Sequence, residues 1–247
     1  ADIHFNNIEE QRNAYLQYDN IIAVSHDVKE SFMKKFNIYN VTVQYNPIDT
    51  IDIIQKSKEV LYPYDVKDCL KVIAVGRLEE QKGFDRLLRI MNKLKQNGYK
   101  FNLTVLGEGR LRKYLEGYII ENQLESYIEL RGFISNPYPY LKNADLYVCS
   151  SYTEGFSTVA TEALILGLPI VTTDCSGMRE LFGTFECGII TNNNEDDLFL
   201  GLRKIFDDVS LLQHYKSQIA KRNKSFDLKR RISEIEGIFD ETSVNCM

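Results

Sequence analysis

The chain of 247 residues is poor in the residues that build disulfide frameworks and metal sites. Its five cysteines show no Cys-x-x-Cys spacing and have no histidine near them, so we expect reduced, mostly buried thiols. The sequence holds only three histidines, and it lacks an Asp-x-Asp pair of the kind that binds a metal ion. We therefore expect neither a disulfide framework nor a bound metal.

Long apolar runs and an excess of positive charge are also absent from the sequence. No run reaches the roughly 18 apolar residues that suggest a membrane-spanning helix, and no signal-peptide pattern is visible. The net charge is −5 and the isoelectric point is near 5.4, which argues against nucleic acid as a partner but leaves a local phosphate site open. We expect a cytoplasmic protein, either free or peripherally associated with the inner face of the membrane.

What the sequence does contain is a regular alternation of apolar strands and helices, with 44% hydrophobic residues to form a core. The expected strands are residues 20–25, 41–45, 72–75, 101–106, 127–130, 146–149, 170–172 and 188–190. The expected helices are residues 26–36, 84–96, 110–122 and 138–143, one that follows residue 157 and ends near residue 167, and three helical segments across 195–239. From residue 70 onward this alternation predicts an α/β fold with a Rossmann-like, doubly wound parallel sheet, whose ligand binds at the carboxyl ends of the strands.

Two glutamates eight positions apart, Glu154 and Glu162, lie in the most informative segment of the chain. Between them the turn Gly155-Phe156-Ser157-Thr158 opens an apolar helix. A helix N-terminus presents unpaired N–H groups and a partial positive charge, which suits phosphates and polar ligands. Both carboxylates can accept hydrogen bonds from the hydroxyls of one sugar-containing ligand. Taken alone, two glutamates at this spacing are more often a solvated loop glutamate and a glutamate on a helix surface than a ligand-binding pair.

This segment, with the strand at 169–173 that follows it, resembles the Glu-x7-Glu motif of retaining glycosyltransferases with the GT-B fold, most closely glycosyltransferase family 4. The resemblance covers roughly residues 18–240 and is strongest over 70–192. It implies that Glu154 contacts the transferred sugar and that Glu162 binds the ribose of the donor nucleotide. The intervening residues would line the same donor pocket, namely Gly155, Phe156, Ser157 and Thr158.

A glycine and two cations follow the strand at 72–75. Gly76 lets the backbone turn sharply, and Arg77 and Lys82 lie on the loop after it. Arginine and lysine can bind a diphosphate and stabilise the charge that develops on it as it leaves. The segment Gly76–Gly83 also resembles the pyrophosphate-binding element of the same family. The resemblance thus implies Arg77, Lys82 and Glu154 as catalytic residues, whereas without it the segment is compatible with an ordinary charged loop.

Two further strand ends carry weaker signals. Gly107-Glu108-Gly109 follows the strand at 101–106 but lacks the third glycine of a dinucleotide fingerprint, so we interpret it as a structural turn. Phe133 and Ile134 follow the strand at 127–130, where members of the family surround the nucleotide base. The resemblance therefore implies that these two side chains form the base pocket.

The resemblance also implies three parts of the chain. Residues 1–60 would be the tail of an acceptor-side domain and a linker, 61–225 the nucleotide-sugar-binding domain, and 226–247 a C-terminal helix and tail. The run Tyr62-Pro63-Tyr64 marks the expected linker. Most of the acceptor domain of a GT-B enzyme is missing, so we expect it either in a longer enzyme or on a partner chain.

In function, the resemblance implies a retaining hexosyltransferase. It would transfer a hexose from a nucleotide diphosphate sugar, with a UDP-sugar favoured, to a glycan or lipid-linked acceptor in surface polysaccharide or glycolipid synthesis. The donor is a substrate, and no cofactor is expected. Two alternatives stay open: a non-catalytic nucleotide-sugar-binding or partner-binding module of a split enzyme, and a GT-B epimerase acting on a UDP-sugar. Three histidines, His4, His26 and His214, are few for the acid/base chemistry of an epimerase.

Overall fold

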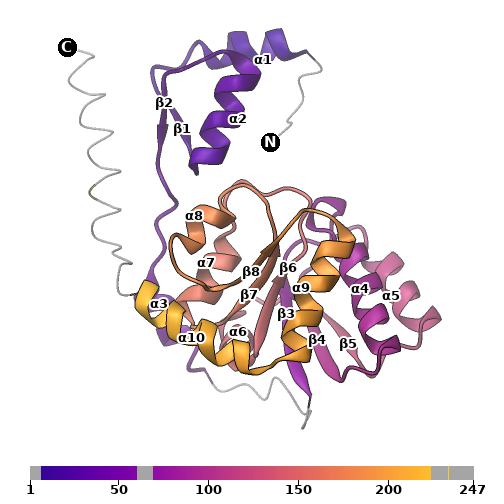
Figure 1. The fold of residues 1–247 in the computed structure, drawn as a ribbon. Coiled ribbons are helices and arrows are strands. Elements are labelled where there is room, and N and C mark those ends of the chain that lie inside the picture. The colour runs from indigo at the N-terminus through magenta and orange to yellow at the C-terminus, as the bar shows by residue number, and fades with distance from the viewer. Residues whose placement is uncertain (1–6, 60–68, 224–232, 234–247) are drawn as a thin grey trace. The chain divides into compact units, whose positions relative to one another are not determined.

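The computed structural model describes residues 7–59, 69–223 and Ser233, and its contacts divide the chain after Ile48 into two compact units (Figure 1). The larger unit runs from Asp49 to Phe226. The division falls before the boundary that we expected at residue 60. The reason is a helix at residues 50–56, which packs with the larger unit. The expected linker at 62–64 and the expected C-terminal part at 226–247 lie outside the described ranges, apart from Ser233, and the assignment of residues 1–60 to an acceptor-side domain stays a prediction.

The N-terminal unit contains two short parallel strands and two helices. The elements are α1 (Ile8–Tyr15), β1 (Ile21–Ala23), α2 (His26–Phe36) and β2 (Val41–Val43). Helix α2 begins where expected because the Ser25 side chain accepts a hydrogen bond from the backbone N–H of Val28, at 3.1 Å. Strands β1 and β2 lie where they were expected but are shorter, and Ile22 in the middle of β1 is exposed.

The larger unit is built on a six-stranded parallel sheet. Its strands are β3 (Leu70–Val75), β4 (Phe101–Leu106), β5 (Ile128–Gly132), β6 (Leu146–Cys149), β7 (Ile170–Thr173) and β8 (Gly188–Thr191). They are arranged in the order β5-β4-β3-β6-β7-β8. Counted from β3, this is the order 3-2-1-4-5-6 of the dinucleotide-binding fold. The predicted α/β, doubly wound parallel sheet is therefore confirmed, and its topological switch point lies between β3 and β6.

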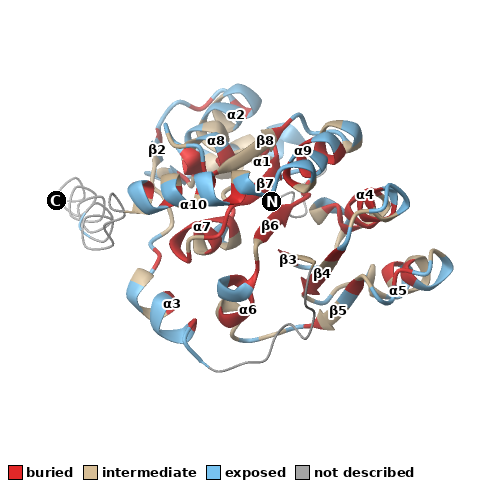
Figure 2. Cartoon of the chain, turned by 60° about the horizontal axis from the view of Figure 1, so that its bottom comes forward, coloured by how far each residue is buried: buried red, intermediate tan, exposed pale blue. Residues whose placement is uncertain are grey.

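Helices cover both faces of this sheet (Figure 1). They are α3 (Thr50–Lys56), the 3-10 turn η1 (Glu80–Lys82), α4 (Phe84–Gln96), α5 (Arg112–Glu121), α6 (Tyr138–Asn143), α7 (Thr158–Ile165), α8 (Met178–Phe182), α9 (Glu195–Asp207) and α10 (Ser210–Asn223). Helix α4 packs against α5 and α9, while α7 packs against α3, α6 and α10. Figure 2 shows the buried residues on the central strands and on the inward sides of these helices.

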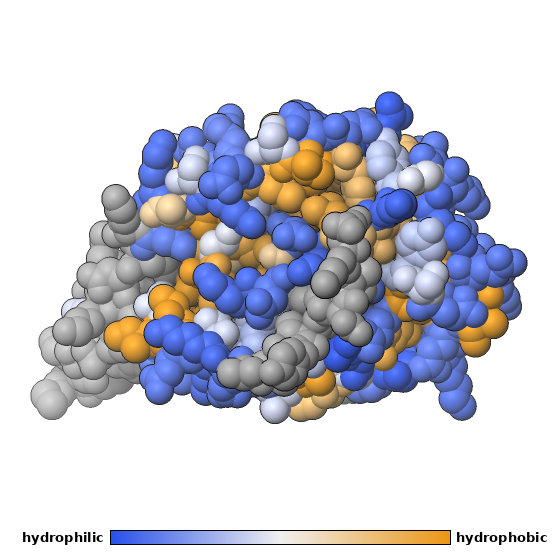
Figure 3. All heavy atoms as spheres, turned by 90° about the horizontal axis from the view of Figure 1, so that it is seen from below, coloured by the Kyte–Doolittle hydropathy of each residue, from blue (hydrophilic) through white to orange (hydrophobic). Residues whose placement is uncertain are grey.

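The core between the sheet and its helices is apolar, as the strand pattern predicted. Val72, Leu87, Leu103 and Leu146 are fully buried within one cluster. The surface seen from below is mainly hydrophilic, with apolar areas between the charged side chains (Figure 3). No helix in the described ranges has both the length and the apolar character to cross a bilayer.

Several elements differ from the sequence-based expectation, among them η1 and α8, which were not among the expected helices. Helices α1 and α3 were not predicted, although Asp49 caps α3 by accepting hydrogen bonds from the N–H groups of Ile51 and Asp52. The helix expected from residue 110 begins at Arg112, with Leu111 as its N-cap residue. The four described cysteines are free thiols, and three of them are buried, as predicted.

Candidate donor site

Two adjoining hollows lie at the carboxyl end of β3, next to the switch point of the sheet. The first, of about 170 Å³, is called the Lys82 hollow, and the second, of about 410 Å³, is called the Arg77 hollow. Val75 and Gly76 line both of them. The Lys82 hollow is also lined by the predicted residues Lys82, Glu154, Phe156, Ser157 and Thr158. The Arg77 hollow is also lined by Arg77, Phe133, Ile134 and Glu162.

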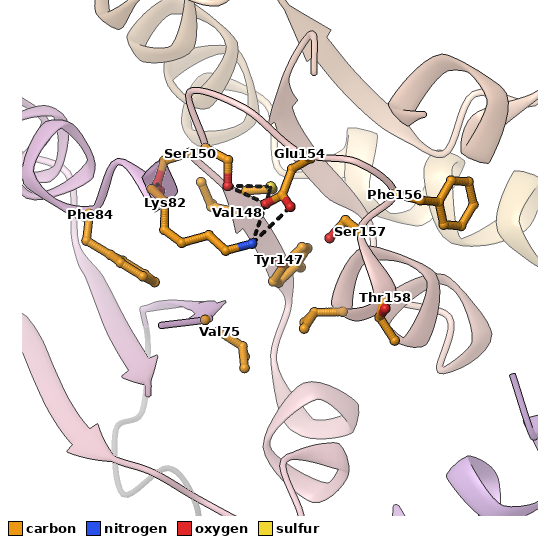
Figure 4. Close-up of a pocket in the computed structure, with 14 residues that line it drawn as sticks. Val75, Lys82, Phe84, Tyr147, Val148, Ser150, Glu154, Phe156, Ser157 and Thr158 are labelled. Atoms are coloured by element: carbon orange, nitrogen blue, oxygen red, sulfur yellow. Dashed lines mark hydrogen bonds and ion pairs between the residues drawn. The ribbon is translucent and has the colours of Figure 1, made fainter. Parts of the chain in front are cut away.

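An ion pair between Lys82 and Glu154 spans the Lys82 hollow (Figure 4). Lys82 Nζ lies 2.7 Å and 2.9 Å from the two carboxylate oxygens of Glu154. The hydroxyl of Ser151 donates a third hydrogen bond, at 2.5 Å, to Glu154 Oε1. The Glu154 side chain is only 8% exposed and that of Lys82 is 23% exposed. The candidate phosphate-binding ammonium is therefore held by the candidate sugar-binding carboxylate.

The N-terminus of α7 forms one wall of the same hollow. Ser157 is the N-cap residue, and its hydroxyl accepts a hydrogen bond from the N–H of Ala160, at 3.2 Å. Thr158 is the first helical residue. Its N–H is therefore one of those at a helix N-terminus that have no hydrogen-bond partner within the helix. The ring of Phe156 points away from the Lys82–Glu154 pair in Figure 4. Gly155 is exposed and does not line either hollow.

The Arg77 hollow combines a cation, the two carboxylates of Glu108 and Glu162, and apolar side chains. The Arg77 side chain is exposed, and its guanidinium makes no hydrogen bond or ion pair with any residue of the described ranges. Phe133 is 75% exposed, as expected of a ring whose contact face is available to a ligand. The hydroxyl of Tyr138 donates a hydrogen bond of 3.1 Å to Glu162 Oε1. The arrangement offers a positive charge and an acceptor around a partly apolar space.

Burial changes the proton affinity of the two polar groups at this end of the hollow. It raises the pKa of Glu162 above the ordinary 4.5, against the opposing effect of the hydrogen bond from Tyr138. Burial, together with the nearby Glu162 carboxylate, raises the pKa of Tyr138 to about 12. Tyr138 therefore keeps its proton at neutral pH and remains a donor to Glu162.

The Gly107-Glu108-Gly109 turn supports the loop that carries these cations. A Cβ atom on Gly107, whose φ is +146°, would lie 1.8 Å from the carbonyl oxygen of Gly76. Glycine is therefore required for the two strand ends to approach this closely. The structure agrees with the interpretation of this segment as a structural turn.

Sequence reasoning missed several residues around the two hollows. Tyr138 was assigned only to a helical turn, although its position six residues after Gly132 carries it back to the sheet edge. Ser151 and the buried Arg86 support Glu154 through contacts that no sequence spacing reveals. The two described histidines lie elsewhere: His26 is near the Tyr45 ring in the N-terminal unit, and His214 pairs with Glu186. Within the described ranges, no three His, Cys, Asp or Glu residues cluster in a way that could hold a metal ion.

Two known proteins match most of the length of this chain. A relative from Campylobacter jejuni, N-acetylgalactosamine-N,N'-diacetylbacillosaminyl-diphospho-undecaprenol 4-alpha-N-acetylgalactosaminyltransferase, is 36% identical over 217 residues. These residues cover 86% of this chain and 58% of that protein. An uncharacterized glycosyltransferase from Methanocaldococcus jannaschii is 28% identical over 92% of this chain and 65% of its own length. The chain thus spans about six tenths of the length of these relatives.

Solved structures share the fold at lower identity. Anabaena Alr3699/HepE, solved in complex with UDP, has a TM-score of 0.82 and is 19% identical, with 98% of this chain and 70% of that chain covered. Sucrose-phosphate synthase from Thermosynechococcus elongatus has a TM-score of 0.81 and is 17% identical, with 96% and 62% covered. The model of the family described as glycosyl transferases group 1 matches residues 65–222, which include both hollows. The chain belongs to the glycosyl transferases group 1 family.

Proposed function

We propose that this chain is the donor-binding part of a retaining glycosyltransferase that uses a UDP-sugar. The acceptor is a glycan or a lipid-linked glycan in the synthesis of a surface polysaccharide or glycolipid. The observation that carries the proposal is the pair of adjoining hollows at the switch point of the sheet, one lined by Lys82 and Glu154 and the other by Arg77, Glu108 and Glu162. A nucleotide sugar has the matching composition, because its diphosphate joins a ribose and a hexose that both offer hydroxyl donors.

The Arg77 hollow suits the nucleoside and the Lys82 hollow suits the sugar. Phe133 and Ile134 offer an apolar surface for the base, and Glu162 has an acceptor for the ribose hydroxyls. The diphosphate would lie over Gly76, which lines both hollows. Arg77 and Lys82 would then neutralise it from the two sides.

The names of relatives support the choice of donor and acceptor. The Campylobacter relative is named as a transferase of N-acetylgalactosamine to a diphospho-undecaprenol-linked acceptor. Alr3699/HepE was solved with UDP and with UDP and glucose. We therefore propose UDP as the nucleotide and UDP-N-acetylgalactosamine as the first donor to test.

The residues at the hollows supply electrostatic catalysis and orientation. Arg77 and Lys82 stabilise the charge that develops on the UDP leaving group as the bond between the sugar and the diphosphate breaks. Glu154 accepts a hydrogen bond from a sugar hydroxyl and holds the ring for attack from the face that the diphosphate leaves. Lys82 must share its ammonium with the diphosphate, so donor binding loosens the Lys82–Glu154 pair and releases a carboxylate oxygen for the sugar. The described residues supply these roles without a metal ion, and none is proposed.

Calorimetric titration tests the proposal. The full chain is titrated with UDP, GDP and ADP, and then with UDP-N-acetylgalactosamine and UDP-glucose. Saturable binding of UDP but not of the other diphosphates is expected. Binding of none of the three would contradict the proposal for this chain.

Two substitutions separate the roles of the carboxylates. Glu162→Ala should weaken UDP itself about 10- to 100-fold, as for a lost charge-assisted hydrogen bond. Glu154→Ala should weaken the sugar nucleotide and leave UDP bound at least as tightly, because Lys82 loses its internal partner. If both variants bind UDP and UDP-sugar like the wild type, the assignment of the site is wrong. In a transfer assay with the longer enzyme, a changed sugar still attached to UDP would point to epimerisation instead.

A further inference from the structure

Arg86, on the first turns of α4, is a buried cation without a carboxylate partner in the described ranges. Arg86 has one of the largest fully buried side chains in the described ranges, and only 1% of the residue is exposed. The neighbouring carboxylate of Asp85 is paired with Arg89 instead, at 3.1 Å. Burial lowers the pKa of the Arg86 guanidinium. Removing an arginine from water is costly unless its N–H groups are bonded, so an apolar residue would be the easier choice at this position if packing were its only task.

The Arg86 guanidinium binds the backbone of the loop that leads to Glu154. Its Nε donates to the carbonyl of Ser150 at 2.7 Å, and its Nη2 donates to the carbonyl of Ser151 at 2.5 Å. Nη2 also donates to Asn193 Oδ1, at 2.9 Å. The guanidinium carbon lies 3.9 Å from the centre of the Tyr152 ring. One side chain from α4 therefore contacts three consecutive residues of this loop.

Two more side chains continue the same anchoring. Asn193 Nδ2 donates to the carbonyl of Tyr152 at 2.7 Å, and Gln81 Nε2 donates to the carbonyl of Thr153 at 3.0 Å. Four consecutive backbone carbonyls, at residues 150–153, thus accept hydrogen bonds from side chains of η1, α4 and the segment after β8. The loop lies beyond the end of β6, so strand pairing does not hold it. These side chains help to fix its path, together with the Thr173 hydroxyl and the Cys175 thiol, which also donate to the carbonyl of Ser151, and the bond from the N–H of Tyr152 to the carbonyl of Gln81.

The anchored loop leads into Glu154 and contacts the backbone of Lys82, the two members of the ion pair in the Lys82 hollow. Ser151 donates to Glu154 Oε1, and Glu154 follows the last anchored carbonyl. On the other side, the hydroxyl of Ser150 donates to the carbonyl of Lys82, at 3.0 Å. Arg86 binds the carbonyls of both serines. It is therefore connected, through Ser150 and Ser151, to both Lys82 and Glu154.

We propose that Arg86, assisted by Asn193, is a positioning residue that fixes Glu154 in the donor site through the backbone carbonyls of residues 150–153. This inference rests on the proposed donor site, because it takes Glu154 as the group that orients the sugar. Arg86 touches neither hollow, so its effect on a ligand must pass through the loop. Its removal should therefore affect the sugar end of a donor far more than the nucleotide end.

The test compares Arg86→Met, Arg86→Lys and Asn193→Ala with Arg89→Met as the matched control. Arg89 lies on the same helix one turn further on, but it pairs with Asp85 and Glu195 rather than with the loop. Each full-length chain is titrated with UDP and with UDP-N-acetylgalactosamine. In Arg86→Met and Asn193→Ala, the affinity for UDP should stay within about twofold of the wild type. The affinity for the sugar nucleotide should fall at least about fivefold, which corresponds to part of the free energy of one charge-assisted hydrogen bond. Arg86→Lys should recover part of the loss, and Arg89→Met should match the wild type with both ligands.

A second measurement needs no ligand and is independent of the proposed function. Amide hydrogen exchange is followed by segment in the four variants and the wild type. Residues 150–155 should exchange faster in Arg86→Met and Asn193→Ala, with the strand β4 unchanged and with Arg89→Met like the wild type. If the wild type binds no nucleotide, the proposed function fails while the exchange data still decide whether Arg86 fixes the loop.

Two outcomes would overturn the inference. One is an equal weakening of UDP and UDP-N-acetylgalactosamine in Arg86→Met, which would make Arg86 a purely structural residue. The other is unchanged exchange at residues 150–155 in variants that remain folded. Asn193→Ala keeps the test decisive if Arg86→Met does not fold, because Asn193 is exposed and its loss leaves the buried guanidinium bonded to Ser150 and Ser151.

Discussion

At the scale of single residues, the two candidate phosphate-binding cations differ in their partners and in their exposure. Lys82 is paired with Glu154 inside the Lys82 hollow, whereas Arg77 is exposed and its guanidinium has no partner in the described ranges. A ligand that binds both must compete with Glu154 for Lys82 but finds Arg77 available. The same change in charge should therefore have different consequences at the two positions.

We predict that Arg77→Met weakens binding of UDP without lowering stability, and that Lys82→Met does both. Each should cost about 1.5–3 kcal/mol in the free energy of UDP binding, as for a hydrogen bond to a charged group. Lys82→Met should also lower the free energy of unfolding by about 1–3 kcal/mol, because it leaves a largely buried carboxylate without its cation. Calorimetric titration and urea unfolding measure the two effects. Lys113→Met, at an exposed position on α5, is the control, and a stability loss in Arg77→Met equal to that in Lys82→Met would contradict the prediction.

Glu162 is expected to bind ribose at some cost in stability. Its pKa is raised by burial, so the folded state favours the protonated carboxyl. For such a group the stabilisation is fully present below the unfolded value, near 4.5, and is lost as the pH rises through the folded pKa. At neutral pH the ionised, partly buried carboxylate therefore lowers the free energy of unfolding.

Accordingly, Glu162→Gln should be more stable than the wild type at pH 7. A glutamine stays neutral and can still accept the hydrogen bond from Tyr138. The gain should shrink as the pH falls and disappear below about pH 4.5, the unfolded value. Urea unfolding at a series of pH values measures it, with Glu125→Gln at an exposed position as the control. A gain that is independent of pH would show that ionisation of Glu162 is not its cause.

At the scale of secondary-structure elements, the strands and most helices of the larger unit were predictable because their patterns are local. Near-continuous apolar runs such as 101–106 predict buried parallel strands, and Ser25 and Ser157 are helix caps that the sequence displays. Helix α3 was missed because it is a single polar-rich stretch whose burial depends on packing against α6 and α7. Propensity alone cannot predict a short helix that tertiary contacts stabilise.

The candidate site was predictable to the extent that its residues follow strand ends. Gly76, Arg77 and Lys82 follow β3, and Glu154 follows β6, so the doubly wound topology brings them to one edge. The donors that support Glu154 could not be predicted in this way. Arg86 and Asn193 lie 68 and 39 residues from it in the sequence, and their contacts go to backbone carbonyls, which carry no side-chain signal.

The junction between η1 and α4 depends on a glycine. Gly83 has φ of +62°, and a Cβ atom there would lie 2.2 Å from the carbonyl oxygen of Ser150. Gly98, at the end of α4, also has a positive φ, of +84°, but a Cβ atom there meets nothing within 4 Å. The two positions therefore separate the cost of the backbone conformation from the cost of the contact.

We predict that Gly98→Ala lowers the free energy of unfolding by about 1–2 kcal/mol, the cost of a left-handed residue with a side chain. Gly83→Ala should cost clearly more, because its methyl group also displaces the carbonyl that Arg86 holds. Urea unfolding measures both changes. Equal losses in the two variants would mean that the loop at Ser150 moves aside freely, against the anchoring proposed for it.

At the scale of the whole molecule, every residue that lines either hollow belongs to the unit from Asp49 to Phe226. A ligand that binds only the folded state stabilises what it binds by mass action, by about 2.7 kcal/mol when its concentration is 100 times the dissociation constant. The stabilisation by UDP should therefore appear first in this unit. Strands β1 and β2 of the N-terminal unit contribute no residue to the hollows.

We predict that saturating UDP slows amide hydrogen exchange in the segments around β3, β6 and α7 and leaves that of β1 and β2 unchanged. The physical reason is that the free energy of opening rises only for the cooperative unit whose opening releases the ligand. Exchange of the full chain, resolved by segment and measured with and without UDP, provides the data. Glu162→Ala at the same UDP concentration is the control, and it should show less added protection because its affinity for UDP is reduced. Equal protection of β1 and β2 in the wild type would show that UDP binding is coupled to the N-terminal unit as well, and that residues outside the two hollows take part in holding the donor.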